Sequence, residues 1–451
     1  MEGTHRKALM ALLLIGVFMA ALDLAIIGPA LPAIQADFGM SSRGLAWLFN
    51  IYVLFQLVGT PLLAKMSDRY GPRPIYITSI SLFAIGSLVI VLAPEDSWMY
   101  VGRAIQGFGG AGIFPVAAAL IGDIFPPEKR GGALGLLGAV FGIAFLIGPV
   151  LGGILLQFSW QWLFLINLPI AIALIWGAWK LMPVGTIGKA HKPFDLAGAI
   201  TLSITLTTLA IAITNFDSTS GLEGLLSISV WPFLLCAVIV APLHWRFEKR
   251  AADPIIRPAF FDNPQIVLSS AITLGLGAMQ SGTVFYTALA VTSMGISESH
   301  AAWLLVPGIL LTTVASPLAG VLINRLGARL LVVFGLVCIS IGFMLYGMMN
   351  IDVILFVVAG CIAGLGFATS LGAPLRVIVM NAASDADRGA AQGLLNVSVN
   401  IGQLLGAAVV GGVAASHGGG TAGYQAAYVV LGCMTAILVM LGIRLKPRST
   451  Q

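Results

Sequence analysis

The sequence predicts an all-α membrane protein with 14 transmembrane helices, in which two pseudo-symmetric six-helix bundles are joined by two inserted linker helices. Three observations support this fold class. Of the 451 residues, 58% are hydrophobic and 9% are charged, whereas about 25% of the residues of a soluble domain are charged. Long apolar segments recur along the chain, and motifs of the first half recur in the second half at a nearly constant spacing.

Fourteen apolar segments are candidates for spanning helices, because about 20 mostly apolar residues cross a bilayer as a helix. Their periodicity is weak, as expected of helices that are apolar all round. The segments lie near residues 9–34, 46–64, 75–93, 98–122, 133–156, 162–182, 196–214, 227–244, 265–292, 299–323, 330–349, 353–378, 391–414 and 424–443.

Lysine and arginine predict the orientation, because the cytoplasmic loops of membrane proteins carry an excess of both. With the N-terminus in the cytoplasm and alternating spans, all but two of the 23 basic residues fall inside, Arg376 among them. Arg43 falls outside and Arg103 lies within a span. We therefore expect a multi-pass protein of the cell (inner) membrane with both termini cytoplasmic. The scattered basic residues do not indicate nucleic-acid binding.

Two long polar stretches, residues 183–195 and 245–264, bracket the seventh and eighth segments. This predicts a division of the chain into an N-terminal six-helix bundle over 1–183, a linker region with two extra transmembrane helices over 184–263, and a C-terminal six-helix bundle over 264–451.

An internal repeat supports this division. At a spacing of 258 residues, Arg130 matches Arg388, Gly135 matches Gly393 and Gly148 matches Gly406. At a spacing of 256, residues 68–73 match residues 324–329. At a spacing of 257, residues 107–109 match residues 364–366. Parallel repeats around a central site are an architecture of secondary transporters.

Asp23 is the only carboxylate that these placements put deep within a span. A charge there costs at least about 2.5 kcal/mol on insertion scales, so it should face the protein interior. It is a candidate for taking up and releasing protons, and the alternative is an anchor held by a neighbouring helix. At the repeat spacing of 257, Gln280 replaces Asp23 and Gly360 replaces Arg103, so the second half should lack both charges.

Arg103 has two interpretations, participation in proton transfer or extension of its side chain to the membrane surface. Candidate substrate contacts are uncharged polar residues within spans, each of which could equally form a helix–helix hydrogen bond. These candidates are Asn50, Gln106, Gln280, Tyr286, Asn396 and Asn400.

Three motifs carry a family resemblance. Ala64-Lys65-Met66-Ser67-Asp68-Arg69-Tyr70-Gly71-Pro72-Arg73 joins the second and third segments, residues 103–110 lie in the fourth, and Gly148-Pro149 with Gly152-Gly153 lies in the fifth. Together they resemble the major facilitator superfamily, and specifically its fourteen-helix drug:proton antiporter branch, over nearly the whole chain.

The resemblance implies roles for these residues. Asp68, Arg69, Gly71, Arg73 and Arg130 would form a cytoplasmic latch. Gly148, Pro149, Gly152 and Gly153 would be the motif that marks antiporters, and Arg103 would act in proton transfer beside Asp23.

The function we expect is proton-coupled export of small hydrophobic or amphipathic compounds by alternating access, with substrate and proton competing for a central cavity. A dedicated metabolite, lipid or sugar exporter and a non-transporting membrane sensor or assembly protein are the alternatives. The sequence contains no phosphate-binding loop or clustered nucleophile and base, so we expect neither an enzyme nor ATP drive. The four cysteines lie singly in apolar runs and indicate no metal or cofactor. The expected partners are a small-molecule substrate, protons and the lipid bilayer, and the chain is expected to be a monomer.

Overall fold

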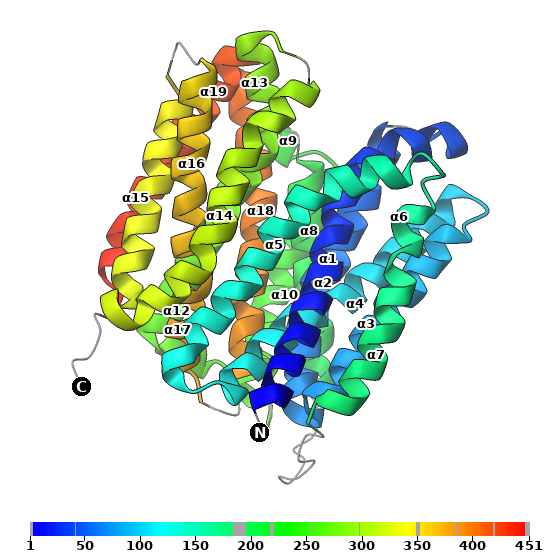
Figure 1. The fold of residues 1–451 in the computed structure, drawn as a ribbon, viewed down its shortest axis with the longest axis vertical. Coiled ribbons are helices and arrows are strands. Elements are labelled where there is room, and N and C mark those ends of the chain that lie inside the picture. Colours follow the sequence, from blue (N-terminus) through cyan, green and yellow to red (C-terminus); the bar gives the residue numbers. More distant parts are fainter. Residues whose placement is uncertain are drawn as a thin grey trace.

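The computed structural model describes residues 3–40, 42–183, 195–216, 221–252, 254–296, 298–348, 352–384, 387–417 and 420–446. The first group of helices is α1 (Gly3–Phe38), α2 (Ser42–Tyr70), α3 (Pro72–Val91), α4 (Asp96–Ile124), α5 (Pro127–Leu155), α6 (Trp162–Leu165) and α7 (Asn167–Leu181). We call these helices the N-terminal bundle, and they occupy one side of the molecule in Figure 1.

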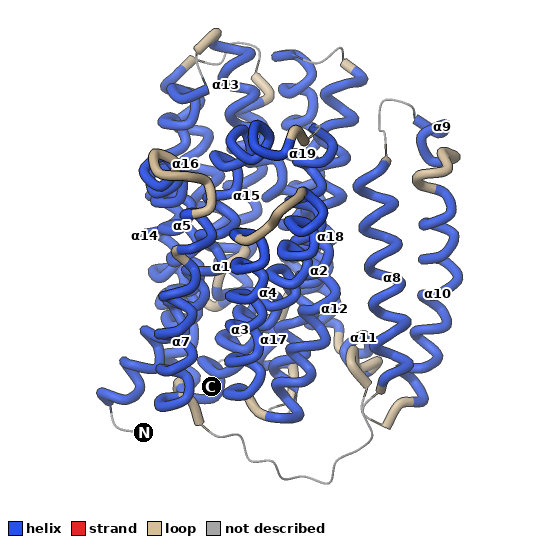
Figure 2. Tube along the Cα trace, turned by 90° about the vertical axis from the view of Figure 1, so that its right-hand side faces the viewer, coloured by secondary structure: helices blue, strands red, loops and turns tan. Residues whose placement is uncertain are grey.

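The middle of the chain forms α8 (Leu196–Asn215), α9 (Gly221–Leu225), α10 (Trp231–Arg250) and α11 (Ala259–Asp262). The C-terminal bundle is α12 (Pro264–Gly282), the 3-10 helix η2 (Thr283–Phe285), α13 (Tyr286–Met294), α14 (Glu298–Leu326), α15 (Ala328–Tyr346), α16 (Val353–Ser370), α17 (Ala373–Ala382), α18 (Arg388–Ser416) and α19 (Gly420–Ile443). Figure 2 shows α8 and α10 standing beside the two bundles.

The chain is an all-helical membrane protein in the part that the structure describes. Each predicted segment coincides with helix, and ten helical stretches of the described residues are long and apolar enough to cross a membrane. The total of fourteen spans stays a prediction.

The two bundles repeat the same helix contacts. α3 packs on α4 as α15 packs on α16, and α1 packs on α5 as α12 packs on α18. The turn before α3 places Gly71 at φ 90°, and the turn before α15 places Gly327 at φ 80°. Both are left-handed conformations that glycine adopts without a steric penalty. The matched pair agrees with the 256-residue spacing of the sequence repeat.

Three predicted continuous segments are broken in the structure. The 162–182 segment is divided at Ile166 between α6 and α7. The 265–292 segment changes from α12 through η2 to α13, and the Tyr428 hydroxyl donates to the carbonyl of Gly282 at this change, at 2.8 Å. The 353–378 segment is interrupted at Leu371 and Gly372, and α17 restarts with Pro374 in its first turn. Proline lacks the N–H that would continue the preceding helix. The positions of these breaks depend on tertiary hydrogen bonds and backbone angles. The length of an apolar segment does not predict either.

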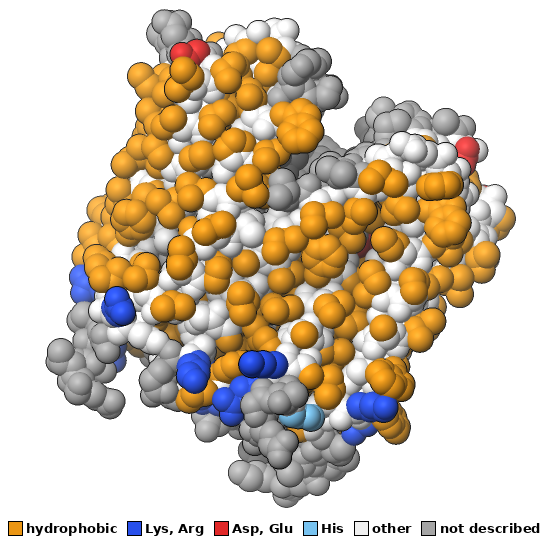
Figure 3. Space-filling model, in the orientation of Figure 1, with side chains coloured by type: hydrophobic (Ala, Val, Ile, Leu, Met, Phe, Trp, Pro, Cys, Tyr) orange, Lys and Arg blue, Asp and Glu red, His pale blue; other side chains and the backbone are white. Residues whose placement is uncertain are grey.

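The bundles meet at the end where both termini lie. Lysine and arginine side chains gather there, and the space-filling surface is hollowed between the bundles at the opposite end (Figure 3). We call these the basic end and the hollow end. Apolar residues of both bundles, including Leu134 and Ile323, share one core cluster. The bundles are therefore closed against each other at the basic end.

A stripe of small residues forms much of this closure. A Cβ added to Gly131 of α5 would overlap the Gly320 carbonyl oxygen of α14, and one added to Gly135 would lie 2.6 Å from the carbonyl oxygen of Ser316. Small residues permit such close approach of two helix backbones. The glycines of α5 therefore serve the contact between bundles.

Candidate functional site

Asp23 lies inside the N-terminal bundle with none of its surface exposed. One carboxylate oxygen accepts from Arg103 of α4 at 2.7 Å. The other accepts from Gln106 of α4 at 2.7 Å and from Asn167 of α7 at 3.2 Å. The predicted inward orientation of Asp23 is thus observed. Its carboxylate forms an ion pair with Arg103 and also accepts hydrogen bonds from the two amides.

Arg103 is equally enclosed, so the alternative in which it reaches the membrane surface is wrong. Its NH1 atom also donates to the Gln106 side-chain oxygen at 2.6 Å, and its Nε donates to the Leu48 carbonyl of α2 at 3.2 Å. The guanidinium lies over the ring of Tyr52, 4.3 Å from the centroid. A planar, five-donor group can satisfy these partners together, whereas a lysine ammonium cannot.

Ser87 of α3 completes the network. Its hydroxyl accepts from Gln106 at 2.9 Å and from Asn167 at 3.3 Å, and it donates to the Phe83 carbonyl at 3.0 Å. Several buried atoms still lack a hydrogen-bond partner, namely Arg103 NH2, Tyr52 OH and Asn167 Oδ1. Buried polar atoms without partners are rare and often mark functional sites. The network therefore holds both donors and an acceptor that the described side chains leave unused.

The location of Asp23 corrects one expectation. Its hydrogen-bond and ionic partners come from α4 and α7, and the carboxylate has no exposed surface. Direct competition between substrate and proton for this carboxylate in a cavity between the bundles is therefore not what this arrangement supports. Gln106, predicted as a substrate contact, instead belongs to the enclosed Asp23 network.

The second half carries a different chemistry at the matching position. Gln280 accepts from Gln403 of α18 at 3.0 Å. A Cβ added to Gly360, the counterpart of Arg103, would lie 2.8 Å from the Tyr346 hydroxyl. Tyr286 stacks on Tyr428 with centroids 5.6 Å apart, and its own hydroxyl is buried without a partner. An aromatic cluster thus replaces the charged network, and Tyr286 is buried within it.

Asp68 bridges the bundles at the basic end. One carboxylate oxygen accepts from the backbone N–H of Ala390 at 2.9 Å, and a Cβ on Gly389 would overlap the other. Asp68 therefore caps the N-terminus of α18, where unpaired N–H groups and the helix dipole favour a carboxylate. Burial raises the pKa of the Asp68 carboxyl to about 7. Near neutral pH, this latch can exist with or without a proton.

The other predicted latch residues serve the surrounding structure. Arg69 lies over the Tyr70 ring, Arg73 lies 4.6 Å from the Trp179 ring centroid of α7, and Arg130 donates to the Phe125 carbonyl at 3.0 Å. Arg73 is thus engaged with its own bundle. An ion pair that the prediction missed, Arg388 to Asp123 at 2.9 Å, joins α18 to α4.

The antiporter-motif residues lie towards the hollow end of α5. A Cβ added to Gly148 would lie 2.5 Å from the Ala25 Cβ of α1, two residues from Asp23. Gly152 is buried, Gly153 is exposed, and the side chain of Pro149 lies outside the described residues. Gly148 thus allows α5 to press against the helix that carries Asp23.

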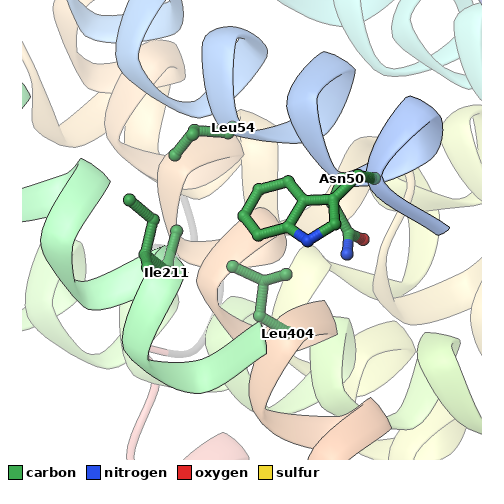
Figure 4. A pocket seen from close by; sticks show the side chains of 6 residues that line it. Asn50, Leu54, Ile211 and Leu404 are labelled. Carbon is green, nitrogen blue, oxygen red and sulfur yellow. The ribbon is translucent and has the colours of Figure 1, made fainter. Parts of the chain in front are cut away.

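Asn50 lines a shallow, mostly apolar pocket between α2, α8 and α18 (Figure 4). The pocket is lined by Trp47, Asn50, Leu54, Ala210, Ile211 and Leu404. Asn50 therefore lies where a linker helix meets both bundles. Asn400 is half-buried on α18, and Asn396 of the same helix accepts from Arg376 at 2.9 Å.

Arg376 was expected on the cytoplasmic side, near the end of the 353–378 segment. It lies in α17, within a helical stretch apolar enough to span the membrane. Gln280 and Gly360 still stand where the first half has Asp23 and Arg103. The hydrogen bonds of Arg376 to α18 were not predicted. Ser87 and Asn167 were also missed, although Asn167 stands in the apolar stretch Trp160–Pro169 that opens the sixth segment.

Comparisons with known proteins agree with this fold. The family model described as Major Facilitator Superfamily matches residues 13–279 and 267–451. The chain is 34% identical to the uncharacterized MFS-type transporter YfiU of Bacillus subtilis, over 90% of this chain and 79% of that protein. It is 29% identical to multidrug resistance protein 3 of the same organism, over 89% and 78% respectively.

The structure of the proton:xylose symporter XylE superposes with a TM-score of 0.69 at 14% identity, covering 99% of this chain and 97% of that one. That likeness shows the fold. The family consists of transporters, which are not enzymes, as the sequence predicted. The chain belongs to the major facilitator superfamily.

Proposed function

We propose that this protein is a proton-coupled exporter of small hydrophobic or amphipathic compounds, with Asp23 as the proton site. The single observation that carries the proposal is the enclosed Asp23–Arg103 pair at 2.7 Å within a network of neutral amides and a hydroxyl. Intramembrane ionisable residues are retained chiefly for function. The relative named multidrug resistance protein 3 favours export of drug-like compounds.

In the proposed cycle, protonation of Asp23 removes its negative charge and weakens the ion pair with Arg103. Arg103 then retains Gln106, the Leu48 carbonyl and the Tyr52 ring as partners. The contacts that hold α1 against α4 and α7 change as a result. Proton and substrate therefore act on each other through the packing of the N-terminal bundle.

The cycle also needs a gate between two arrangements of the bundles. With fourteen spans and cytoplasmic termini, the closed basic end faces the cytoplasm, and the hollow end faces outward. The Asp68 cap on α18 and the Arg388–Asp123 pair would hold this outward-open arrangement. Release of both contacts would open the cytoplasmic side to substrate. We place the protein in the cell membrane as a monomer.

Asp23→Asn tests the proton site. A thermal-shift screen across drugs and metabolites first identifies a ligand, because ligands that bind the folded state stabilise it. Transport of that compound is then measured in proteoliposomes with and without an imposed pH gradient. We expect the wild type to respond to the gradient and Asp23→Asn to lose that response while still binding the compound. An unchanged response in the variant would defeat the assignment.

A dedicated metabolite, lipid or sugar exporter of the same fold is the second candidate. The thermal-shift screen separates the two, since a multidrug exporter should be stabilised by several unrelated amphipathic compounds. Stabilisation by one metabolite class alone would favour the dedicated exporter.

A further inference from the structure

Arg376 is a cation on α17 for which the described residues supply no carboxylate within ion-pair distance. NH1 donates to the Gln392 side-chain oxygen at 3.0 Å, and NH2 donates to the Asn396 side-chain oxygen at 2.9 Å. Both acceptors are neutral amides of α18. A guanidinium has five N–H donors, so two bonds leave others available. Partial burial of a charge without a counter-charge is unfavourable, and a single anion would compensate for this.

The guanidinium lies between the two bundles. Its Cζ is 4.2 Å from the ring centroid of Phe114 on α4, across the interface from α17. Phe114 in turn packs against Phe141 of α5 with centroids 5.6 Å apart. All three side chains are partly exposed. A cation beside two aromatic rings is thus presented where the bundles face each other.

The surroundings of Arg376 define its depth. Met380, one helical turn further along α17, packs against Gly122 of α4, so that the bundles are closed on the basic side of Arg376. On α18, Gln392, Asn396 and Asn400 recur every four residues, which places them along one helix face. This polar row runs from Arg376 towards the hollow end.

The repeat shows that Arg376 is not required by the fold. At the spacing of 257, its counterpart in the N-terminal bundle is Ala119 of α4, which is buried. The break at Gly372 that starts α17 has no matching break in α4, which is continuous from Asp96 to Ile124. The second half therefore has both a separate helix and a cation where the first half has neither.

We propose that the Arg376 guanidinium binds the anionic group of an amphipathic organic anion whose aromatic or apolar part lies against Phe114 and Phe141. This deepens the proposed function, on which it rests, by naming a substrate class for the space between the bundles. Gln392 and Asn396 hold the guanidinium plane in place. Charge-assisted hydrogen bonds from arginine to an anion are roughly twice as strong as neutral ones.

Two fluorescent probes that differ only in charge test the proposal, dansylglycine and its primary amide. Binding of each to the full-length protein in nanodiscs is measured, with empty nanodiscs subtracted. We expect the wild type to bind the acid at least about tenfold more tightly than the amide. Arg376→Gln should bind the two probes alike, and Arg376→Lys should keep part of the preference because it keeps the charge.

Arg444→Gln is the matched control, because it removes the same charge from an exposed position at the basic end, and it should keep the wild-type preference. Equal binding of both probes by the wild type, including no saturable binding of either, overturns the proposal. A preference that survives in Arg376→Gln overturns it as well.

The two proposals fail separately. If anion binding depends on Arg376 but the wild type shows no gradient-driven transport, the anion site stands and the exporter assignment fails. If transport depends on Asp23 while acid and amide bind equally, the exporter stands and the anion site fails.

Discussion

At the scale of single residues, Asp23 and Arg103 depend on each other, because each is the buried counter-ion of the other. Asp23 and Arg103 were each visible because a charge interrupts an apolar run. Their contact at 2.7 Å joins residues 80 positions apart, and no motif spacing reports that distance. Ser87 and Asn167 were missed because nothing in the sequence shows which polar residues of the spans the fold brings to the Asp23 network. Arg376 was missed because its segment was taken to end near residue 378, at the basic end.

The Asp23–Arg103 pair should behave as a unit in thermal stability. Arg103→Gln leaves a carboxylate buried without its counter-ion, a change that typically destabilises by about 3–5 kcal/mol. Asp23→Asn leaves the guanidinium equally unpaired. We expect the double variant Asp23→Asn/Arg103→Gln to lower the melting temperature by less than the two single losses combined.

An exposed pair is the control for this cycle. Asp123 is about half exposed in its contact with Arg388, so Asp123→Asn and Arg388→Gln should each change stability by about 1 kcal/mol or less. Additive losses for Asp23 and Arg103 would contradict the account of a coupled pair.

At the scale of helices, the glycines of α5 allow close contacts with two neighbours. They face α14 at the basic end and α1 near Gly148. The breaks between α12 and α13 and between α16 and α17 were not predicted, because a bilayer selects apolar length whether or not the helix is continuous. The contact of Asp68 with α18 is observed, and Arg73 lies over the ring of Trp179 in α7. The latch itself stays a prediction.

Gly135→Ala should open the basic end. The new methyl group would lie 2.6 Å from the Ser316 carbonyl oxygen and 2.9 Å from the Pro317 Cα, both backbone atoms that cannot turn aside. Gly132→Ala gains the same helix propensity, but its methyl group would meet Val321 at an ordinary 3.4 Å. Spin labels at positions 70 and 326, in a cysteine-free background, report the distance between bundles. We expect it to increase in Gly135→Ala and to stay unchanged in Gly132→Ala.

Closure at the basic end should depend on pH through Asp68. The pKa of this carboxyl is about 7 in the closed arrangement, raised by burial from 3.8. Between pH 3.8 and about 7, Asp68 is therefore more often protonated in the closed arrangement than in an open arrangement, where water would solvate its carboxyl. Protons thus favour the closed arrangement, and closure should strengthen as the pH falls from 8 to 5. Lys65 and Asp387 also face Asp68, and they lower and raise its pKa respectively.

The same spin-label pair measures this effect. We expect the fraction of short distances to rise on acidification in the wild type and to respond less in Asp68→Asn, which carries no titratable proton. If the spin-label distances of the wild type do not change with pH, or if Asp68→Asn shows the same change as the wild type, Asp68 is not the titrating group.

At the scale of the whole molecule, the repeat predicted which helices correspond, and the matching packing of α3 on α4 and α15 on α16 agrees with it. Which end is closed could not be predicted, because neither apolar length nor the repeat indicates where the two bundles touch. The closed basic end depends on contacts between distant segments, such as Asp68 with Ala390. The two bundles differ, because one holds a charged network and the other an aromatic cluster. The sequence shows this difference only in that Gln280 and Gly360 replace Asp23 and Arg103.

The proposed function requires that a proton bound at Asp23 moves against the exported compound. Proteoliposomes are loaded with a pH indicator, and the compound is driven inward by its own concentration gradient, with no initial pH gradient. We expect the lumen of wild-type vesicles to become alkaline as protons leave, and Asp23→Asn vesicles to take up the compound without a change in internal pH. Alkalinisation at the wild-type rate in Asp23→Asn would show that Asp23 is not the proton site.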